Sequence, residues 1–289
     1  MAALSPLKAP PFFMHLQALL DQPPKLPSLP RAVALLMGEL AKAEPSQRRL
    51  SQLFATDPTL AAQLLREANA PAHGARGQIN AIAEALALLG VQPLRELVAR
   101  AAVGARSVPG VDLPQFWRYS LHAAKMARSL AGLVRHNQLA AYTAGLVHAL
   151  GELVLHLADP ARMQSIGALA GPLDLRRGLL ERHLLGYSYA QVSAGLARQW
   201  DFPQDVVDAL QHHLTPFDNE VYEPLAGVLH LAVWRARTHA LGLNERETVV
   251  TFPGEVGVAL GLDIDTVLQQ DPIDWNAPPA ETPLAGRLA

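Results

Sequence analysis

The chain has 289 residues, of which 50% are hydrophobic and 17% are charged, and its formal net charge is −2. The low charged share argues against a disordered chain, and the nearly neutral balance argues against a protein built to bind nucleic-acid backbones. The absence of cysteine excludes disulfides, thiolate metal sites and cysteine nucleophiles, and it agrees with a cytoplasmic location.

The N-terminal segment, residues 1–25, is rich in proline and is expected to carry little regular structure. It lacks a basic region followed by an apolar run, so the sequence predicts no secretion signal. No window of about 18 uncharged apolar residues occurs along the chain. We therefore expect no membrane span.

Residues 26–106 are expected to form the first of two helical bundles. Apolar residues repeat at helical spacing from Arg31 onward, in short stretches broken by proline and glycine. Asp57 is placed to cap a helix whose first turn holds Pro58, where the missing N–H of proline has no cost. Gly90 is expected to end a later helix of the same bundle.

A second bundle is predicted over residues 112–245, after a linker at 106–114 with the sequence RSVPGVDLP. Residues 115–134 place their apolar side chains on one stripe, as a helix facing a core does. Residues 139–157 are apolar nearly all round, which predicts the most buried helix of the protein. Residues 246–289 are expected to add one helix and a tail. No strand-length alternation persists, so the predicted class is all-α.

An ordered series of motifs resembles one known family. The first half carries LPSLP, DPTLAAQLLREANA, INAIAEALALLG and LRELV, and the second half carries FWRYS, AGLVHALGELVL, LLGYSYAQVSAGLARQW and ALQHH. Together these motifs resemble the HDOD domain, a catalytically divergent branch of the HD metal-dependent phosphohydrolase superfamily found in bacterial signalling proteins. The resemblance implies two packed helical bundles, the second similar to an HD-domain core.

The resemblance also implies where a metal site would lie. In active HD proteins, imidazoles and carboxylates from several helices hold divalent metals that activate a water molecule. The positions of this sequence that match that pattern, together with the position after the His–Asp pair that often holds lysine, are Tyr119, His148, Ala149, Glu152, Tyr189, His212, His213 and Val233.

The residue types at these positions are wrong for metal catalysis. Tyr119 and Tyr189 stand where histidines are expected, and Ala149 and Val233 stand where aspartates are expected. Neutral tyrosines bind divalent metals weakly near pH 7 because their pKa is near 10. Histidines without carboxylates make a poor site for Mg²⁺ or Mn²⁺. The sequence therefore predicts a degenerate centre with no catalytic residue, metal or cofactor.

Two other kinds of site are considered. His148, Glu152 and His156 would broadly share a face of one continuous helix and offer a replacement metal site, although a hydrogen-bonded Glu–His pair is favoured. Basic residues between positions 95 and 135 raise the alternative of a small anionic ligand such as a nucleotide, against the simpler interpretation of solvated helix faces.

The expected function is that of a non-enzymatic, cytoplasmic bacterial signalling module that acts as an output or scaffold through protein–protein contacts with other signalling proteins. The alternatives are a residual metal-dependent phosphohydrolase or phosphodiesterase and a nucleotide-binding regulatory module. A partner is expected in a groove between the bundles, bordered by the linker and by Tyr119, His148, Tyr189 and His213. The favoured alternative is that the tyrosines simply fill the former metal cavity.

Overall fold

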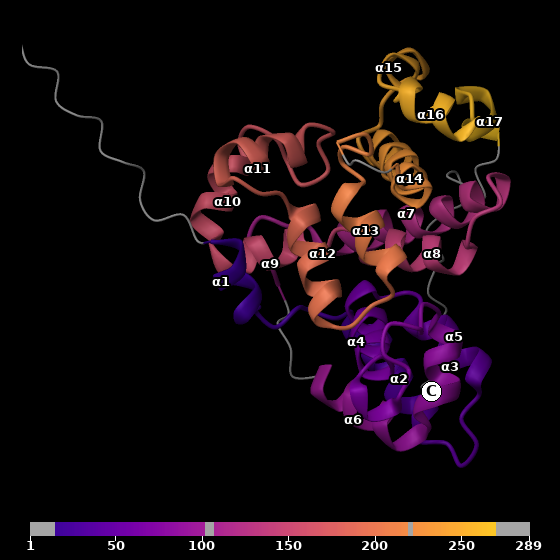
Figure 1. The fold of residues 1–289 in the computed structure, drawn as a ribbon. Helices are drawn as coiled ribbons and strands as arrows, with labels where there is room; N and C mark the ends of the chain where they lie inside the picture. Colours follow the sequence, from indigo (N-terminus) through magenta and orange to yellow (C-terminus); the bar gives the residue numbers. More distant parts are fainter. Residues whose placement is uncertain (1–14, 102–106, 219–221, 270–289) are drawn as a thin grey trace, which may run out of the picture.

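The computed structural model describes residues 15–101, 107–218 and 222–269, and these residues form helices joined by short loops (Figure 1). No β-strand occurs among them, and an isolated bridge between Val108 and Val111 is the nearest approach to one. The predicted all-α class is confirmed. Most of the proline-rich segment and the tail after residue 269 lie outside the described residues.

The first subdomain occupies the lower part of Figure 1 and is built from short helices. These are α2 (Pro30–Leu40), α3 (Gln47–Phe54), α4 (Pro58–Ala68), α5 (Ile82–Leu89) and α6 (Val91–Ala101), with a 3-10 turn at Pro71–His73. Asp57 caps α4 as predicted, because its carboxylate accepts a hydrogen bond from the backbone N–H of Leu60 at 3.0 Å.

The second subdomain is centred on the long helix α7, which packs against α8 and α14. Its helices are α7 (Leu113–Leu133), α8 (Gln138–Val147), α9 (Leu150–Ala158), α10 (Pro160–Gly167), α11 (Arg177–Leu185), α12 (Tyr189–Gln199), α13 (Gln204–His212) and α14 (Pro224–Ala240). Three short helices follow instead of the single one predicted, and they are α15 (Glu245–Val250), α16 (Gly254–Leu260) and α17 (Ile264–Gln269).

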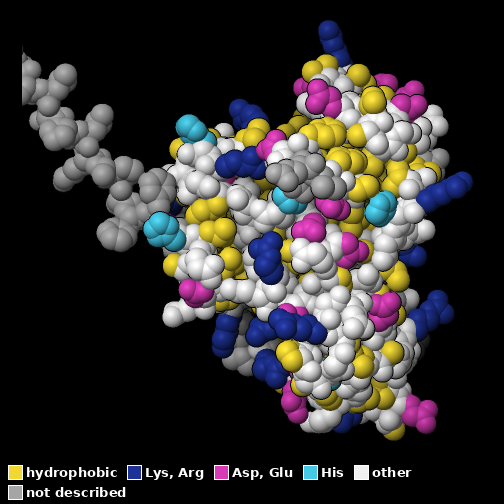
Figure 2. Space-filling model, in the orientation of Figure 1, with side chains coloured by type: hydrophobic (Ala, Val, Ile, Leu, Met, Phe, Trp, Pro, Cys, Tyr) yellow, Lys and Arg dark blue, Asp and Glu magenta, His cyan; other side chains and the backbone are white. Residues whose placement is uncertain are grey.

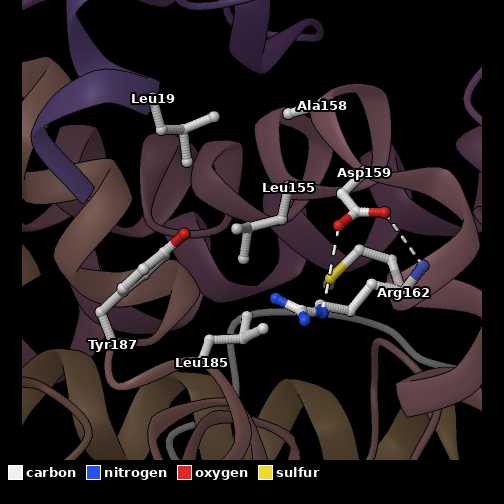
Figure 3. Close-up of a pocket in the computed structure, with 8 residues that line it drawn as sticks. Leu19, Leu155, Ala158, Asp159, Arg162, Leu185 and Tyr187 are labelled. Atoms are coloured by element: carbon white, nitrogen blue, oxygen red, sulfur yellow. Dashed lines mark hydrogen bonds and ion pairs between the residues drawn. The ribbon is translucent and has the colours of Figure 1, made fainter. Parts of the chain in front are cut away.

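A short helix in the N-terminal segment, α1 (Leu16–Asp21), departs from the expectation of little regular structure. It packs against α12 of the second subdomain, and Leu19 and Leu20 are buried there. Figure 3 shows Leu19 facing Leu155 across a small cavity. Gly195 on α12 makes room for α1, since a Cβ at that position would collide with the Leu20 side chain. Burial of two leucines thus stabilises a helix that proline content alone argues against.

The long apolar helix predicted over residues 139–157 is two helices, because α8 ends at Val147 and α9 begins at Leu150. The hydroxyl of Ser193 accepts a hydrogen bond from the Gly151 N–H at 2.8 Å and donates one to the His148 carbonyl at 2.7 Å. One side chain of α12 therefore satisfies backbone groups on both sides of the break. Because of the break, the His148 side chain does not share a helix face with Glu152 and His156 of α9.

The run Gln138–Ala158 is long and apolar enough to cross a membrane by length and composition, with a mean hydropathy of 1.2. However, 89% of its apolar window is buried inside the fold, as in a core helix. No other described run meets the same criterion. In this structure the run forms α8, which packs against α7, and α9, which packs against α12.

The two subdomains share one continuous apolar core and several polar contacts. The Tyr142 hydroxyl of α8 donates to the carbonyl of Ala55 at 3.2 Å, and the backbone N–H of Gly77 donates to the carbonyl of Asp201 at 3.1 Å. Arg76 also forms an ion pair with Asp201 at 2.7 Å. These contacts fix the first subdomain against the second.

Candidate functional site

Four of the predicted site residues meet in the centre of the second subdomain. Tyr119 from α7, His148 from the break between α8 and α9, Tyr189 from the first turn of α12 and His213 from the end of α13 are each at most 2% exposed. The rings of Tyr119 and His148 lie 5.1 Å apart, and those of Tyr189 and His213 lie 5.8 Å apart. Between the two tyrosines lies a residue that the sequence did not indicate, Arg237 of α14.

The Arg237 guanidinium starts two matching hydrogen-bond chains. Its Nε donates to the Tyr119 hydroxyl at 3.1 Å, and one terminal nitrogen donates to the Tyr189 hydroxyl at 3.0 Å. The Tyr119 hydroxyl lies 2.7 Å from Nε2 of His148, and the Tyr189 hydroxyl lies 3.3 Å from Nε2 of His213. Each tyrosine thus stands between the cation and one imidazole.

The far nitrogen of each imidazole fixes the direction of these chains. Nδ1 of His148 lies 2.7 Å from the Gly145 carbonyl, and Nδ1 of His213 lies 2.9 Å from the Leu210 carbonyl. A carbonyl only accepts, so Nδ1 carries the proton in both rings and Nε2 accepts from the tyrosine hydroxyl. Every link from guanidinium to carbonyl has one donor and one acceptor.

Burial sets the protonation states of this cluster. It lowers the pKa of His148 to about 3 and the pKa of His213 well below its usual value of 6.5. Burial also raises the pKa of Tyr119 and of Tyr189 above 10. Near neutral pH the two imidazoles and the two phenols are therefore neutral. The guanidinium of Arg237 is the charged group of these hydrogen-bond chains.

Arg237 is held by uncharged oxygen atoms. Its third contact is to the carbonyl of Asp174 at 3.0 Å, and its guanidinium carbon lies 5.3 Å from the ring centre of Tyr189 and 5.8 Å from that of Tyr119. Aromatic rings at this distance stabilise a cation electrostatically. A fixed positive charge therefore lies among the residues that match the metal-ligand positions.

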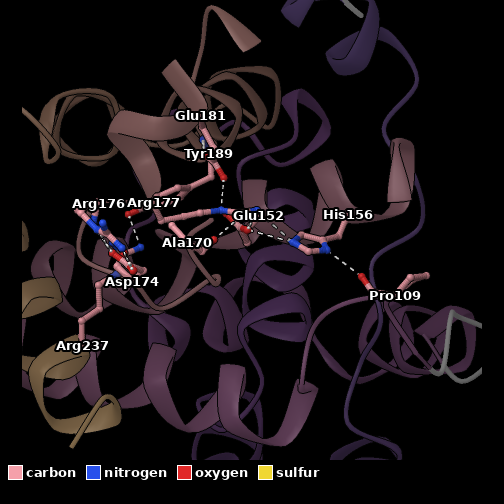
Figure 4. Close-up of polar contacts among 10 residues, drawn as sticks. All are labelled: Pro109, Glu152, His156, Ala170, Asp174, Arg176, Arg177, Glu181, Tyr189 and Arg237. Atoms are coloured by element: carbon pink, nitrogen blue, oxygen red, sulfur yellow. Dashed lines mark hydrogen bonds and ion pairs between the residues drawn. The ribbon is translucent and has the colours of Figure 1, made fainter. Parts of the chain in front are cut away.

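A second buried cluster adjoins the first and is centred on Arg177, which was also missed (Figure 4). Arg177 donates to Glu152 at 2.6 Å, to Glu181 at 2.8 Å and to the carbonyl of Ala170 at 2.8 Å. Glu181 in turn accepts from the backbone N–H of Tyr189 at 2.7 Å, which joins the two clusters. This arrangement gives Arg177 the carboxylate partners that a fully buried arginine requires.

The two carboxyl groups of this cluster differ in pKa. Burial raises the pKa of Glu152, but the hydrogen bond from His156 and the charge of Arg177 outweigh it, so the net pKa is lowered. The pKa of Glu181 is raised by burial and by the negative charge of Glu152. The site therefore favours one carboxylate beside Arg177 over two.

The Arg177 cluster also reaches the linker between the subdomains. Nε2 of His156 lies 3.1 Å from Glu152, and its Nδ1 lies 2.7 Å from the carbonyl of Pro109. The next residue, Gly110, has φ +78°, and a Cβ there would lie 3.2 Å from the His156 ring. Glycine at this position lets the linker backbone approach the imidazole closely.

The remaining predicted residues do not complete a metal site. Ala149 and Val233 are buried but offer no ligand atom, and Glu152 turns to Arg177. His212 is half-buried at the end of α13 and takes no part in the hydrogen-bond chains. In the described part of the chain, no three His, Asp or Glu side chains group in a way that suits a metal ion.

The replacement site of His148, Glu152 and His156 does not form either. The break after α8 directs His148 to Tyr119, whereas Glu152 and His156 hydrogen-bond to each other. In the Tyr119–His148–Tyr189–His213 cluster, the ligand atoms present are two imidazole nitrogens already engaged by tyrosine hydroxyls, with a guanidinium between the tyrosines. These residues do not fit a divalent metal. The Arg237 guanidinium already supplies a positive charge there, and the contacts described for it include no carboxylate.

The fold separates the residues of the predicted basic run, and it buries the tyrosines of the predicted partner groove. The basic run divides, because Arg95 donates twice to the carbonyl that ends α2, whereas Arg118, Lys125 and Arg128 lie exposed along α7. The tyrosines expected to border a partner groove are buried inside the second subdomain. Trp200 is only half-buried and faces the space between the subdomains.

Comparison with known proteins supplies the family. Residues 26–216 match the model of the HDOD domain. An uncharacterized protein of Treponema pallidum is 24% identical over 217 residues, which are 73% of this chain and 42% of that protein. This chain thus spans less than half the length of that relative.

Solved structures with the same fold are also found. The MmoQ response regulator of Methylococcus capsulatus is 25% identical, with a TM-score of 0.68 over 86% of this chain and 98% of that one. A Shewanella amazonensis protein provisionally described as a phosphohydrolase is 29% identical, with a TM-score of 0.52 over 89% and 92%. A virulence factor of Campylobacter jejuni, at 19% identity and a TM-score of 0.63, over 89% and 97%, shares the fold.

Proposed function

Because the chain belongs to the HDOD family, we propose that it is a non-enzymatic signalling module that acts through protein contacts and has a degenerate HD metal site. The family and the response-regulator neighbour support the coarser statement, a signalling module of the HD superfamily. The position of Arg237 supports the more specific part of the proposal, a degenerate metal site without enzymatic activity.

The fixed charge of Arg237 opposes metal catalysis at this centre. An HD-type reaction needs a divalent cation that lowers the pKa of a bound water and polarises a phosphoryl oxygen. In this chain Arg237 places a permanent positive charge against the hydroxyls of Tyr119 and Tyr189. A guanidinium has no bound water to activate, and a metal ion would have to displace it against electrostatic repulsion. We therefore infer that the residues at the former metal-ligand positions stabilise the core and do not catalyse hydrolysis.

Metal analysis tests this proposal. Protein purified without a histidine tag is equilibrated with Mn²⁺, Fe²⁺ or Zn²⁺, passed through a desalting column and assayed for metal by mass spectrometry. We expect far less than one metal ion per chain, and no phosphatase or phosphodiesterase activity with any of the three. A stoichiometric metal that is lost in both His148→Ala and His213→Ala would overturn the proposal.

The protein-contact part needs a separate measurement. Tyr119 and Tyr189 are buried, so a partner would bind the outer surface of the module. Affinity capture from the native cell, followed by reconstitution of the purified pair, should yield a complex with defined stoichiometry. Failure of every captured candidate to bind the purified chain would count against a scaffold or output role.

A further inference from the structure

A large groove lies where the two subdomains meet, away from the buried clusters. Its volume is about 790 Å³, and α4 and α6 of the first subdomain and α9 and α12 of the second contribute to its walls. The residues that matter for recognition are Lys25, Thr59, Arg66, Arg100, Val154 and Trp200. The volume falls within the range of about 300–1,000 Å³ that is usual for small-molecule sites. We call this space the inter-subdomain groove.

The groove is positively charged. Lys25, Arg66 and Arg100 line it, whereas Glu67 is the single acidic residue among the described residues that line it. Glu67 is already engaged, since it lies 3.5 Å from Arg100 and 3.9 Å from His73. Figure 2 shows Lys and Arg side chains gathered between α12 and α6, where the subdomains meet. Three cations against one carboxylate in a concave site favour an anionic ligand.

The groove also offers a flat aromatic surface and apolar walls. Trp200 is half-buried, and the guanidinium carbon of Arg66 lies 5.8 Å from its ring centre. Val154 and Leu196 add apolar area beside the indole. Because the Arg66 guanidinium lies over the indole ring, a planar ligand ring can stack on the outer side of this pair, as nucleobases do on tryptophan and arginine.

A buried hydroxyl in the groove has no hydrogen-bond partner within the described protein. Thr59 lines the groove and is fully buried, yet its Oγ1 makes no hydrogen bond there. A buried polar atom without a partner costs free energy, so such atoms are rare unless a ligand or water completes them. Because the Thr59 side chain is fully buried, its hydroxyl lies directly behind the wall of the groove.

We propose that the inter-subdomain groove binds a nucleotide-class ligand, with its phosphate near Lys25, Arg66 and Arg100 and its planar base against Trp200. The apolar walls at Val154 and Leu196 would contact the base or the sugar. Because the groove is walled by both subdomains, the bound ligand would contact both. This proposal does not depend on the state of the metal centre, which involves other residues.

Calorimetric titration of the full chain at low salt tests the proposal. The probes are AMP, GMP and cyclic di-GMP, with inorganic phosphate as a probe without a ring and adenosine as a probe without charge. We expect at least one nucleotide to bind with saturation and more tightly than either control. Absence of saturable binding by all three nucleotides, or equal binding of inorganic phosphate, would overturn the proposal.

Variants locate the binding. Arg66→Gln and Trp200→Leu should each weaken nucleotide binding by about tenfold, the loss expected for one charge-assisted or stacking contact. Lys25→Gln is a third variant, which changes an exposed side chain and should therefore fold as the wild type does. Arg128→Gln removes the same charge from the exposed surface of α7 and should leave binding unchanged. Equal affinity of wild type, Arg66→Gln, Trp200→Leu and Lys25→Gln would place the ligand elsewhere and refute the assignment.

Discussion

The hydroxyls of Tyr119 and Tyr189 perform the same task at two points of the buried cluster. Each accepts a hydrogen bond from Arg237 and donates one to a neutral imidazole, His148 or His213. A phenylalanine at either position would preserve the shape of the core but remove the oxygen. Two buried polar atoms would then lose a partner at once, and this loss is more costly than that of an exposed hydrogen bond.

We predict that Tyr119→Phe lowers the free energy of unfolding by about 1–3 kcal/mol, since Nε of Arg237 and Nε2 of His148 are left unpaired. Urea unfolding followed by circular dichroism measures the change. Tyr222→Phe is the matched control, because the Tyr222 hydroxyl is buried without a partner in the described structure. Its removal breaks no hydrogen bond and should not destabilise the protein. Equal effects of the two variants would show that the hydrogen-bond chain contributes nothing.

Sequence reasoning and structure agree on part of this cluster. The motif positions of Tyr119, His148, Tyr189 and His213 implied one shared site, and these residues do meet. Arg237 could not be placed in the same way, because a long, flexible side chain can reach several different neighbours from one position on a helix. Its true position depends on the tilt of α14 and on the carbonyl of Asp174. The available signal was a charged residue one turn after Val233, within a largely apolar stretch.

At the scale of helices, the close approach of α9 and α12 decides the geometry of the cluster. Gly151 lies against the backbone of α12, and a Cβ there would fall on the carbonyl oxygen of Tyr189. The same approach brings Ser193 to the break between α8 and α9. The small size of one glycine therefore helps to position both Tyr189 and His148.

We predict that Gly151→Ala destabilises the protein by more than about 2 kcal/mol, because the added methyl group meets backbone atoms that cannot move independently of α12. Gly38→Ala in α2 is the control, since a Cβ there has open space. That change should stabilise by up to about 1 kcal/mol through helix propensity. Thermal unfolding of both variants measures the contrast, and a neutral Gly151→Ala would mean that the two helices are not in such close contact.

The helix pattern of the sequence could predict the run 139–157 and its burial but not the break within it. The apolar periodicity is the same for one helix as for two, and neither His148 nor Ala149 is a helix breaker. The break is stabilised from outside the segment by the Ser193 hydroxyl of α12. Local sequence carries no information about such a contact, which arises only when distant helices pack.

At the scale of the whole molecule, the two subdomains bury ionisable groups whose effects on stability have opposite signs. In the first subdomain, burial raises the pKa of Asp57 to about 6, so the folded chain binds a proton more readily than the unfolded chain. In the second subdomain, burial lowers the pKa of His148 and His213, so the folded chain resists protonation. The net pH dependence of stability is a sum, and one group is best isolated by comparing a variant with wild type.

We predict that the stability difference between wild type and His148→Gln shrinks on acidification. The His148 pKa is about 6.5 in an unfolded chain and about 3 in the folded one, so its neutral state favours folding fully above pH 6.5. As the pH falls through this window, His148 becomes protonated in the unfolded wild type but stays neutral in the folded wild type. The advantage of wild type should therefore decline by about 1.4 kcal/mol per pH unit.

Urea unfolding of both proteins at a series of pH values from 7 downward, as far as both remain folded, measures this decline. His136→Gln is the control because His136 is exposed, and its difference from wild type should show no such decline. The comparison with wild type cancels the contributions of Asp57 and of the other buried groups, provided that they titrate alike in both proteins. A constant difference between wild type and His148→Gln would mean that His148 gains its proton over the same pH range in the folded and in the unfolded chain. Once protonated in the folded chain, Nε2 would donate to the Tyr119 hydroxyl, and the chain from Arg237 to the Gly145 carbonyl would have to run with another arrangement of protons.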